Sequence, residues 1–213
     1  MTLTDSNSPT PAFDPAPARD IPYAALAQLA VLHGQARQDM RQAAFLGRSP
    51  QASVVLMLAG AATLMIGGGT TLKADFAWAA LVLLGIVAIT RNYIRGFARA
   101  LRRVPLEKAS SDLRILLLFT GTAWGAGAFL VMPALPSPTL AIAFAVVPSL
   151  ALDQMLQDPP GTLAFVLPVT LIAASVAILD AWPADIWVCA AILVSGAAIA
   201  ILSMLRRDTH GFI

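Results

Sequence analysis

The chain contains few of the side chains from which most catalytic and metal sites are built. It has one cysteine, Cys189, and two histidines, His33 and His210, which lie near opposite ends of its 213 residues. A single cysteine excludes an intrachain disulfide and a cysteine-based metal site. The sequence also lacks a glycine-rich phosphate loop, a serine nucleophile elbow and paired histidines. We therefore expect a protein that is not an enzyme and that holds no metal and no cofactor.

Charged residues are scarce as well. They make up 12% of the chain, while hydrophobic residues make up 58% and the mean hydropathy is +0.75. A soluble domain has about 25% charged and about 45–50% apolar residues. Both differences predict an integral membrane protein. The formal net charge of +2 then reflects basic loops at the membrane surface, so we expect the lipid bilayer and no nucleic acid as a partner.

The chain contains several long runs of apolar residues. A membrane-spanning helix needs about 20 mostly apolar residues. Runs of this kind occupy residues 52–69, 76–92, 113–133, 138–156, 161–179 and 186–205. We expect an all-α membrane protein, a bundle of six transmembrane helices within residues 50–207. The second run is short, and we expect its helix to continue past Arg91 toward Pro105, with the Arg91 side chain reaching the interface.

The residues before the first run predict two further segments. Residues 1–22 are rich in Pro, Ser, Thr and Asp, which predicts a disordered tail, and they have no apolar core for a cleavable signal peptide. Residues 23–49 carry apolar side chains at spacings of three and four, which predicts an amphipathic cytoplasmic helix that ends at Pro50. Residues 208–213 are expected to form a C-terminal tail.

The distribution of basic residues predicts the orientation. Of the fourteen Lys and Arg, all except Lys73 fall on one side of the membrane if the N-terminus is cytoplasmic. Short loops rich in Lys and Arg stay in the cytoplasm. We therefore expect both termini in the cytoplasm.

The segment between the second and third runs, residues 91–114, holds half of the basic residues. Four of them define a basic surface with two possible roles: Arg95, Arg99, Arg102 and Arg103. They could contact anionic lipid, as basic segments beside membrane helices commonly do, or they could dock a protein partner.

Asp153 is the one acidic residue well inside an apolar run. Ionisable groups in a membrane are costly and are candidates for function, so Asp153 with Gln157 one turn away could form a proton or cation site. Alternatively, it is an interfacial carboxylate that pairs with Arg114 or Arg91. Pro148 and Pro168 kink their helices and could open a cavity, and Trp124 near mid-span could line a small-ligand pocket or simply fill the bundle.

Small residues mark the helix-packing faces. Gly121 and Gly125 form a small-xxx-small pattern that allows close approach of another helix, within the bundle or in a dimer. Gly127 and Gly196, together with Ser195, extend these faces. Trp78, Trp182 and Trp187 fall near the outer boundary, where tryptophan commonly anchors a span. Cys189 is expected to be a small buried residue.

The layout resembles a known family. Residues 119–133 read FTGTAWGAGAFLVMP, and the chain leaves the sixth run through LRRDTHGFI. Together with six runs after an N-terminal helix, this resembles the six-helix sensor modules that precede the GGDEF or kinase domain of alphaproteobacterial diguanylate cyclases and histidine kinases. The resemblance covers about residues 24–213, and Trp124 and Pro133 match its short motif. It implies the bacterial inner membrane and signal transduction.

The output domain of that family is absent from the sequence, which stops at Ile213. We therefore expect a non-enzymatic membrane sensor or scaffold that acts on a cytoplasmic output domain or partner, or that assembles with copies of itself. Two alternatives stay open. The chain could be a structural subunit of a larger membrane complex, or a small transporter or channel that uses Asp153.

Overall fold

The computed structural model describes residues 23–67, 72–101, 106–135, 137–179 and 185–209. The predicted tail at 1–22 lies outside these residues, and so do the C-terminal residues 210–213. The chain divides into two units, residues 1–38 and 39–213. All contacts discussed below lie within the second unit.

The described residues are helical and contain no strand, which confirms the predicted all-α class. The long helices are α1 (Tyr23–Gly67), α2 (Leu72–Leu101), α3 (Glu107–Ala126), α5 (Pro138–Leu156), α6 (Pro159–Leu179) and α7 (Asp185–Thr209). A short helix α4 (Ala128–Val131) and a 3-10 turn η1 (Met132–Ala134) complete the segment that follows α3. Among the described residues, six helical segments are long and apolar enough to cross a membrane, as predicted.

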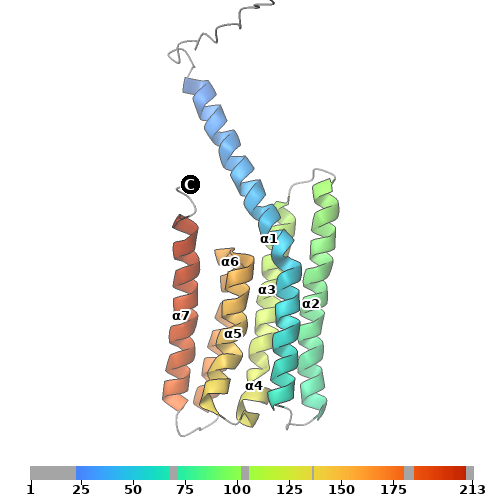
Figure 1. Cartoon of the computed structure of the whole chain (residues 1–213), viewed down its shortest axis with the longest axis vertical. Helices are drawn as coiled ribbons and strands as arrows, with labels where there is room; N and C mark the ends of the chain where they lie inside the picture. Colours follow the sequence, from blue (N-terminus) through green and yellow to red (C-terminus); the bar gives the residue numbers. More distant parts are fainter. Residues whose placement is uncertain (1–22, 68–71, 102–105, 136, 180–184, 210–213) are drawn as a thin grey trace, which may run out of the picture. The chain divides into compact units, whose positions relative to one another are not determined.

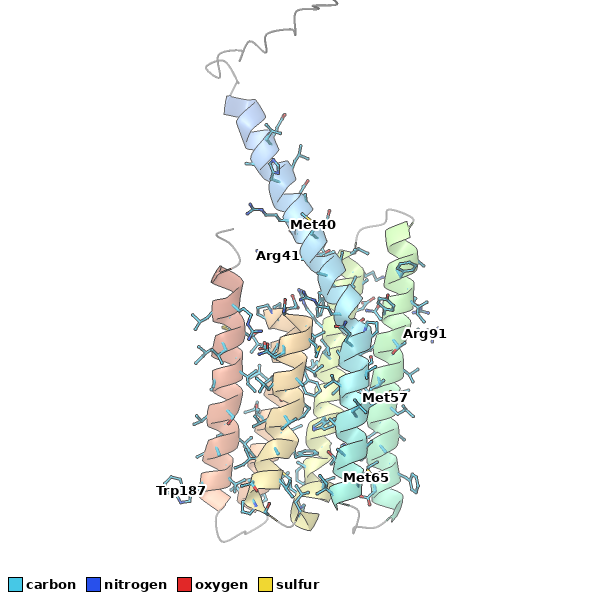
Figure 2. The ribbon with its side chains drawn as sticks, in the orientation of Figure 1. Met40, Arg41, Met57, Met65, Arg91 and Trp187 are labelled. Atoms are coloured by element: carbon cyan, nitrogen blue, oxygen red, sulfur yellow. The ribbon has the colours of Figure 1, made fainter. Side chains whose placement is uncertain are left out.

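The helices of the second unit form a bundle with α3 and α6 at its centre. Helix α3 packs on α2 and α6, and α6 also packs on α5 and α7. In Figure 1, α2 and α7 lie at opposite edges of the bundle. Apolar residues from all these helices form one core, in which Trp124, Phe165 and Leu56 are fully buried. Apolar side chains on the outer surfaces, such as Trp187 in Figure 2, are those expected to meet lipid.

The prediction of a helix end at Pro50 is wrong, because α1 continues through Pro50 to Gly67. Proline has no amide hydrogen, so it leaves the carbonyl of Leu46, four residues earlier, without its helical donor. The hydroxyl of Ser49 donates a hydrogen bond to that carbonyl at 2.8 Å. A neighbouring side chain thus replaces the missing donor, and the first span and the preceding helix are one element.

The second helix continues past Arg91 as predicted and is described as far as Leu101. Its inner side is held by Asn92, which is buried and whose side-chain amide donates to the carbonyl of Ala109 at 2.9 Å. This bond ties α2 to the first turn of α3. One end of the bundle carries an arginine from each of four helices, and we call it the arginine end. The hydrogen bond of Asn92 and the arginine contacts described in the next section place these residues there: Arg48, Arg91, Arg114 and Arg206.

Candidate functional site at the α5–α6 turn

The candidate site is built around the short turn that joins α5 to α6. Helix α5 ends at Leu156, and Gln157 adopts a left-handed backbone with φ 51°. Its N–H donates to the carbonyl of Asp153 at 3.2 Å, as is usual where a helix closes in this conformation. The turn is forced by sequence, because Pro159 and Pro160 cannot continue α5 but are suited to the first turn of a new helix.

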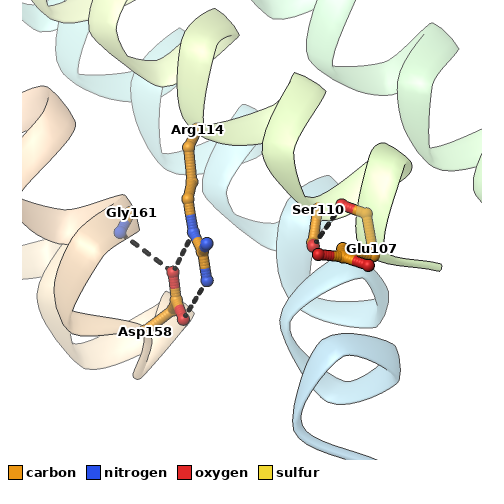
Figure 3. A network of polar contacts seen from close by, with 5 residues as sticks. All are labelled: Glu107, Ser110, Arg114, Asp158 and Gly161. Carbon is orange, nitrogen blue, oxygen red and sulfur yellow. Dashed lines mark hydrogen bonds and ion pairs between the residues drawn. The ribbon is translucent and has the colours of Figure 1, made fainter. Parts of the chain in front are cut away.

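Asp158 caps the new helix and binds α3 at the same time (Figure 3). Its Oδ2 accepts a hydrogen bond from the N–H of Gly161 at 2.9 Å. The guanidinium of Arg114 in α3 donates to both carboxylate oxygens at 3.1 Å. The same guanidinium lies 5.7 Å from the ring centroid of Phe45 in α1. Bidentate pairing of this kind fixes orientation as well as distance, so the turn is held against α3.

Asp153 forms the second ion pair of the site. Its Oδ2 lies 2.9 Å from the guanidinium of Arg206 in the last turns of α7, and the side chain of Asp153 is 2% exposed while that of Arg206 is 28% exposed. The hydroxyl of Thr162 in α6 donates to the other carboxylate oxygen at 3.5 Å. Sequence reasoning offered Arg114 or Arg91 as the partner of Asp153. Arg114 instead pairs with Asp158, and the partner of Asp153 is Arg206.

A third arginine meets the turn from α1. The guanidinium of Arg48 donates to the side-chain oxygen of Gln157 at 2.6 Å. Arginines from α1, α3 and α7 therefore converge on the residues between Asp153 and Asp158. Helices α1, α3 and α7 are therefore all attached to the same turn.

Trp124 lies in the core rather than at the turn. It is fully buried, and its indole N–H donates to the carbonyl of Phe144 at 3.1 Å. That carbonyl is the one that Pro148 leaves without a helical donor, four residues later in α5. The Trp124 and Phe144 rings stack with centroids 5.6 Å apart. Of the predicted pocket residues, Trp124 and Pro148 are thus linked through Phe144, whereas Asp153 belongs to the ion-pair network.

The prediction that Trp78 is an interfacial anchor is wrong. Trp78 is 2% exposed, packs edge-on against Trp124 at 5.6 Å, and donates from its indole to the carbonyl of Ala123 at 3.1 Å. The helix is distorted there, since the N–H of Gly127 is shared between the carbonyls of Ala123 and Trp124. Trp187 is 77% exposed, as an anchor would be, and Trp182 lies outside the described residues.

The predicted packing glycines face other helices of the same chain. A Cβ atom added at Gly121 would lie 2.5 Å from the carbonyl oxygen of Phe165, and one at Gly125 would lie 3.0 Å from that of Pro168. These two glycines therefore form the contact between α3 and α6, and Pro168 is part of it. Gly127 makes room for the ring of Trp78, and Gly196 brings α7 against Thr170 of α6.

Comparison with protein-family models, with curated proteins and with solved structures finds no match for this chain. The resemblance to sensor modules therefore stays a prediction.

On the predicted basic surface, Arg95 projects from α2 and is exposed, while Arg102, Arg103 and the side chain of Arg99 lie outside the described part of the chain. In that described part there is also no group of three or more His, Cys, Asp and Glu placed to hold a metal ion.

Sequence reasoning missed Asn92, Ser49 and Arg48, each of which makes a contact that sets helix geometry at the arginine end. The role of Ser49 could have been predicted, because a serine directly before a proline in a helix can donate its hydroxyl to the carbonyl that the proline leaves without a donor. Nothing in the local sequence marks Asn92 or Arg48, because their partners are 17 and 109 residues away along the chain.

Proposed function

We propose that this chain is a non-enzymatic inner-membrane sensor or scaffold module that relays a change among its membrane helices to a cytoplasmic partner or output domain. The observation that carries the proposal is the buried ion pair between Asp153 and Arg206. It joins the end of α5 to the last turns of α7, where the chain leaves the bundle.

A relay needs an element with distinct arrangements that a signal can favour or disfavour. An ion pair in which the Asp153 side chain is 2% exposed provides two such arrangements, one with the pair formed and one with the pair broken. Breaking such a pair by removing one partner costs about 3–5 kcal/mol, which is enough to hold one arrangement firmly in the absence of a signal. Helix α7 packs on α5 and α6 at the edge of the bundle (Figure 1), so a change at the ion pair would act first on these two neighbours.

The pair also favours the relay over transport through Asp153. A carboxylate that already binds a guanidinium and a hydroxyl is poorly prepared to bind a cation, because the arginine would have to leave first. A role as a structural subunit of a larger complex is compatible with the same geometry, and the second experiment below separates it from the relay.

The first experiment measures the position of α7 directly. Spin labels on cysteines at the exposed positions Met155 and Leu205, in a Cys189→Ala background and in lipid nanodiscs, report the distance between α5 and α7. We expect Asp153→Asn and Arg206→Gln to shift or broaden that distance. Arg206→Gln should also lower stability more than Asp153→Asn does, since it leaves the buried Asp153 charge unpaired, whereas Arg206 is partly exposed.

Arg114→Gln, which breaks the pair with Asp158 instead, is the matched control and should leave the distance between α5 and α7 unchanged. An unchanged distance in both Asp153→Asn and Arg206→Gln would contradict the relay.

The second experiment identifies what the module acts on. The native gene product is tagged at its N-terminus, extracted in mild detergent and weighed intact with whatever co-purifies. A mass well above 22.3 kDa, or a partner whose association changes in Asp153→Asn, is the result expected of a relay. A constant partner indifferent to Asp153→Asn indicates a structural subunit. A chain near that mass with nothing bound would favour transport.

A further inference from the structure

The four arginines of the arginine end, together with Arg95 one turn after Arg91, fall into two classes. Arg48, Arg114 and Arg206 each reach a partner at the α5–α6 turn. Arg91 and Arg95 are exposed on α2 and make no hydrogen bond or ion pair with any side chain that the structure describes. Two neighbouring positive charges that no described side chain pairs are available to a counter-charge from outside the chain.

Their place on α2 points to the source of that charge. Leu84, Val87, Arg91 and Arg95 follow one another at spacings of three and four, so they lie along one face of the helix. Leu84 and Val87 are 57% and 54% exposed, and Figure 2 shows Arg91 on the outer side of α2. The opposite face is turned inward, since Asn92 bonds to α3 and a Cβ added at Gly96 would lie 3.6 Å from Leu46 of α1. The face is therefore apolar within the span and basic where the span ends.

Two more exposed residues place this basic end at the membrane surface. Ile94 and Phe97, on either side of Arg95 in the sequence, are 61% and 59% exposed. Apolar side chains mixed with arginines at the end of a span are typical of a helix that lies in the headgroup layer. A protein partner in solution would not account for Leu84 and Val87, which continue the same face into the apolar span.

We propose that this face of α2 binds an anionic phospholipid, with its phosphodiester held by Arg91 and Arg95 and its acyl chain lying along Val87 and Leu84. A guanidinium group can donate two parallel hydrogen bonds to the oxygens of one phosphate. The helix rises about 1.5 Å per residue, so Val87 lies about 6 Å deeper in the membrane than Arg91, along the path of the acyl chain. A zwitterionic lipid fits less well, because its own ammonium group competes for the phosphate. The inference does not rest on the relay, and it holds for either orientation of the chain.

The test uses the full chain in nanodiscs that contain equal parts of phosphatidylglycerol and phosphatidylcholine. Native mass spectrometry measures which lipid the released protein retains. The variant is Arg91→Gln with Arg95→Gln. The matched control is Arg41→Gln with Lys108→Gln, which removes the same charge from exposed residues of α1 and α3 at the same end of the bundle but off this face.

We expect the preference for phosphatidylglycerol to fall by about fivefold for each arginine removed, and to fall far less in the control. Arg91→Lys with Arg95→Lys should keep part of the preference. An equal loss in the control would overturn the proposal, because it would mean diffuse attraction to charge. Displacement of the lipid by excess inorganic phosphate would also overturn the proposal, because it would indicate a free-anion site. An unchanged preference for phosphatidylglycerol together with loss of a co-purifying protein would overturn it too, because it would indicate a docking surface for that protein.

Discussion

At the scale of single residues, stability depends on what replaces the hydrogen bonds that prolines remove. Pro50 and Pro148 each leave a carbonyl without its helical donor. Ser49 supplies a local donor to the carbonyl of Leu46, and Trp124 supplies a donor from another helix to that of Phe144. The second case matters more for the fold, because the indole also links α3 to α5 through a stacked pair of rings.

We expect Trp124→Phe to lower the free energy of unfolding by about 1–3 kcal/mol, because the buried carbonyl of Phe144 loses the indole donor that replaces its helical one. Thermal unfolding in nanodiscs measures the change. Trp187→Phe, at a 77% exposed position, is the control and should have little effect.

A double-mutant cycle makes this prediction specific to the proline. In a Pro148→Ala background the alanine N–H can bond to the Phe144 carbonyl, so Trp124→Phe should cost less there than in the native chain. An equal cost in both backgrounds would mean that ring packing, and not the hydrogen bond, explains the role of Trp124.

At the scale of helices, two glycines let the backbones of α3 and α6 approach closely at the centre of the bundle. Gly121 and Gly125 allow the backbone of α6 near Phe165 and Pro168 to lie against α3. Backbone atoms cannot move aside as a side chain can. The close approach therefore depends on the absence of Cβ atoms at these positions.

Gly121→Ala should destabilise the protein by about 1–3 kcal/mol, because its methyl group would collide with the Phe165 carbonyl, 2.5 Å away. Gly47→Ala is the matched control, since a Cβ there has no neighbour within 4 Å. It should be neutral or stabilising by up to about 1 kcal/mol through helix propensity. Unfolding temperature and detergent-extracted yield measure both. A Gly121→Ala variant that melts at the native temperature would contradict the close approach of α3 and α6.

At the scale of the whole molecule, charge is collected at one end of the bundle. Arginines from α1, α2, α3 and α7 lie at the arginine end, and three of them are paired at the α5–α6 turn. Basic residues next to spans favour the cytoplasmic side. The proposed orientation therefore puts the α5–α6 turn, the basic end of α2 and the end of α7 in the cytoplasm.

Cysteine labelling in intact spheroplasts tests this orientation. In a Cys189→Ala background, a cysteine at Ile186, which is 76% exposed at the other end of the bundle, should react with a membrane-impermeant maleimide. A cysteine at Lys108 should react only after the membrane is permeabilised. Labelling of both in detergent is the control for reactivity, and labelling at Lys108 in intact cells would reverse the orientation.

The sequence alone determined the number of spans, their approximate limits and the position of the basic residues relative to them. These properties depend on the composition of about 20 consecutive residues, because each span must satisfy its own backbone and meet lipid. Tertiary structure decided the rest. It buried Trp78 and paired Asp153 with Arg206, Asp158 with Arg114 and Gln157 with Arg48. These outcomes depend on which helix faces lie together, and residues 44 to 109 positions apart carry no local mark of their contact.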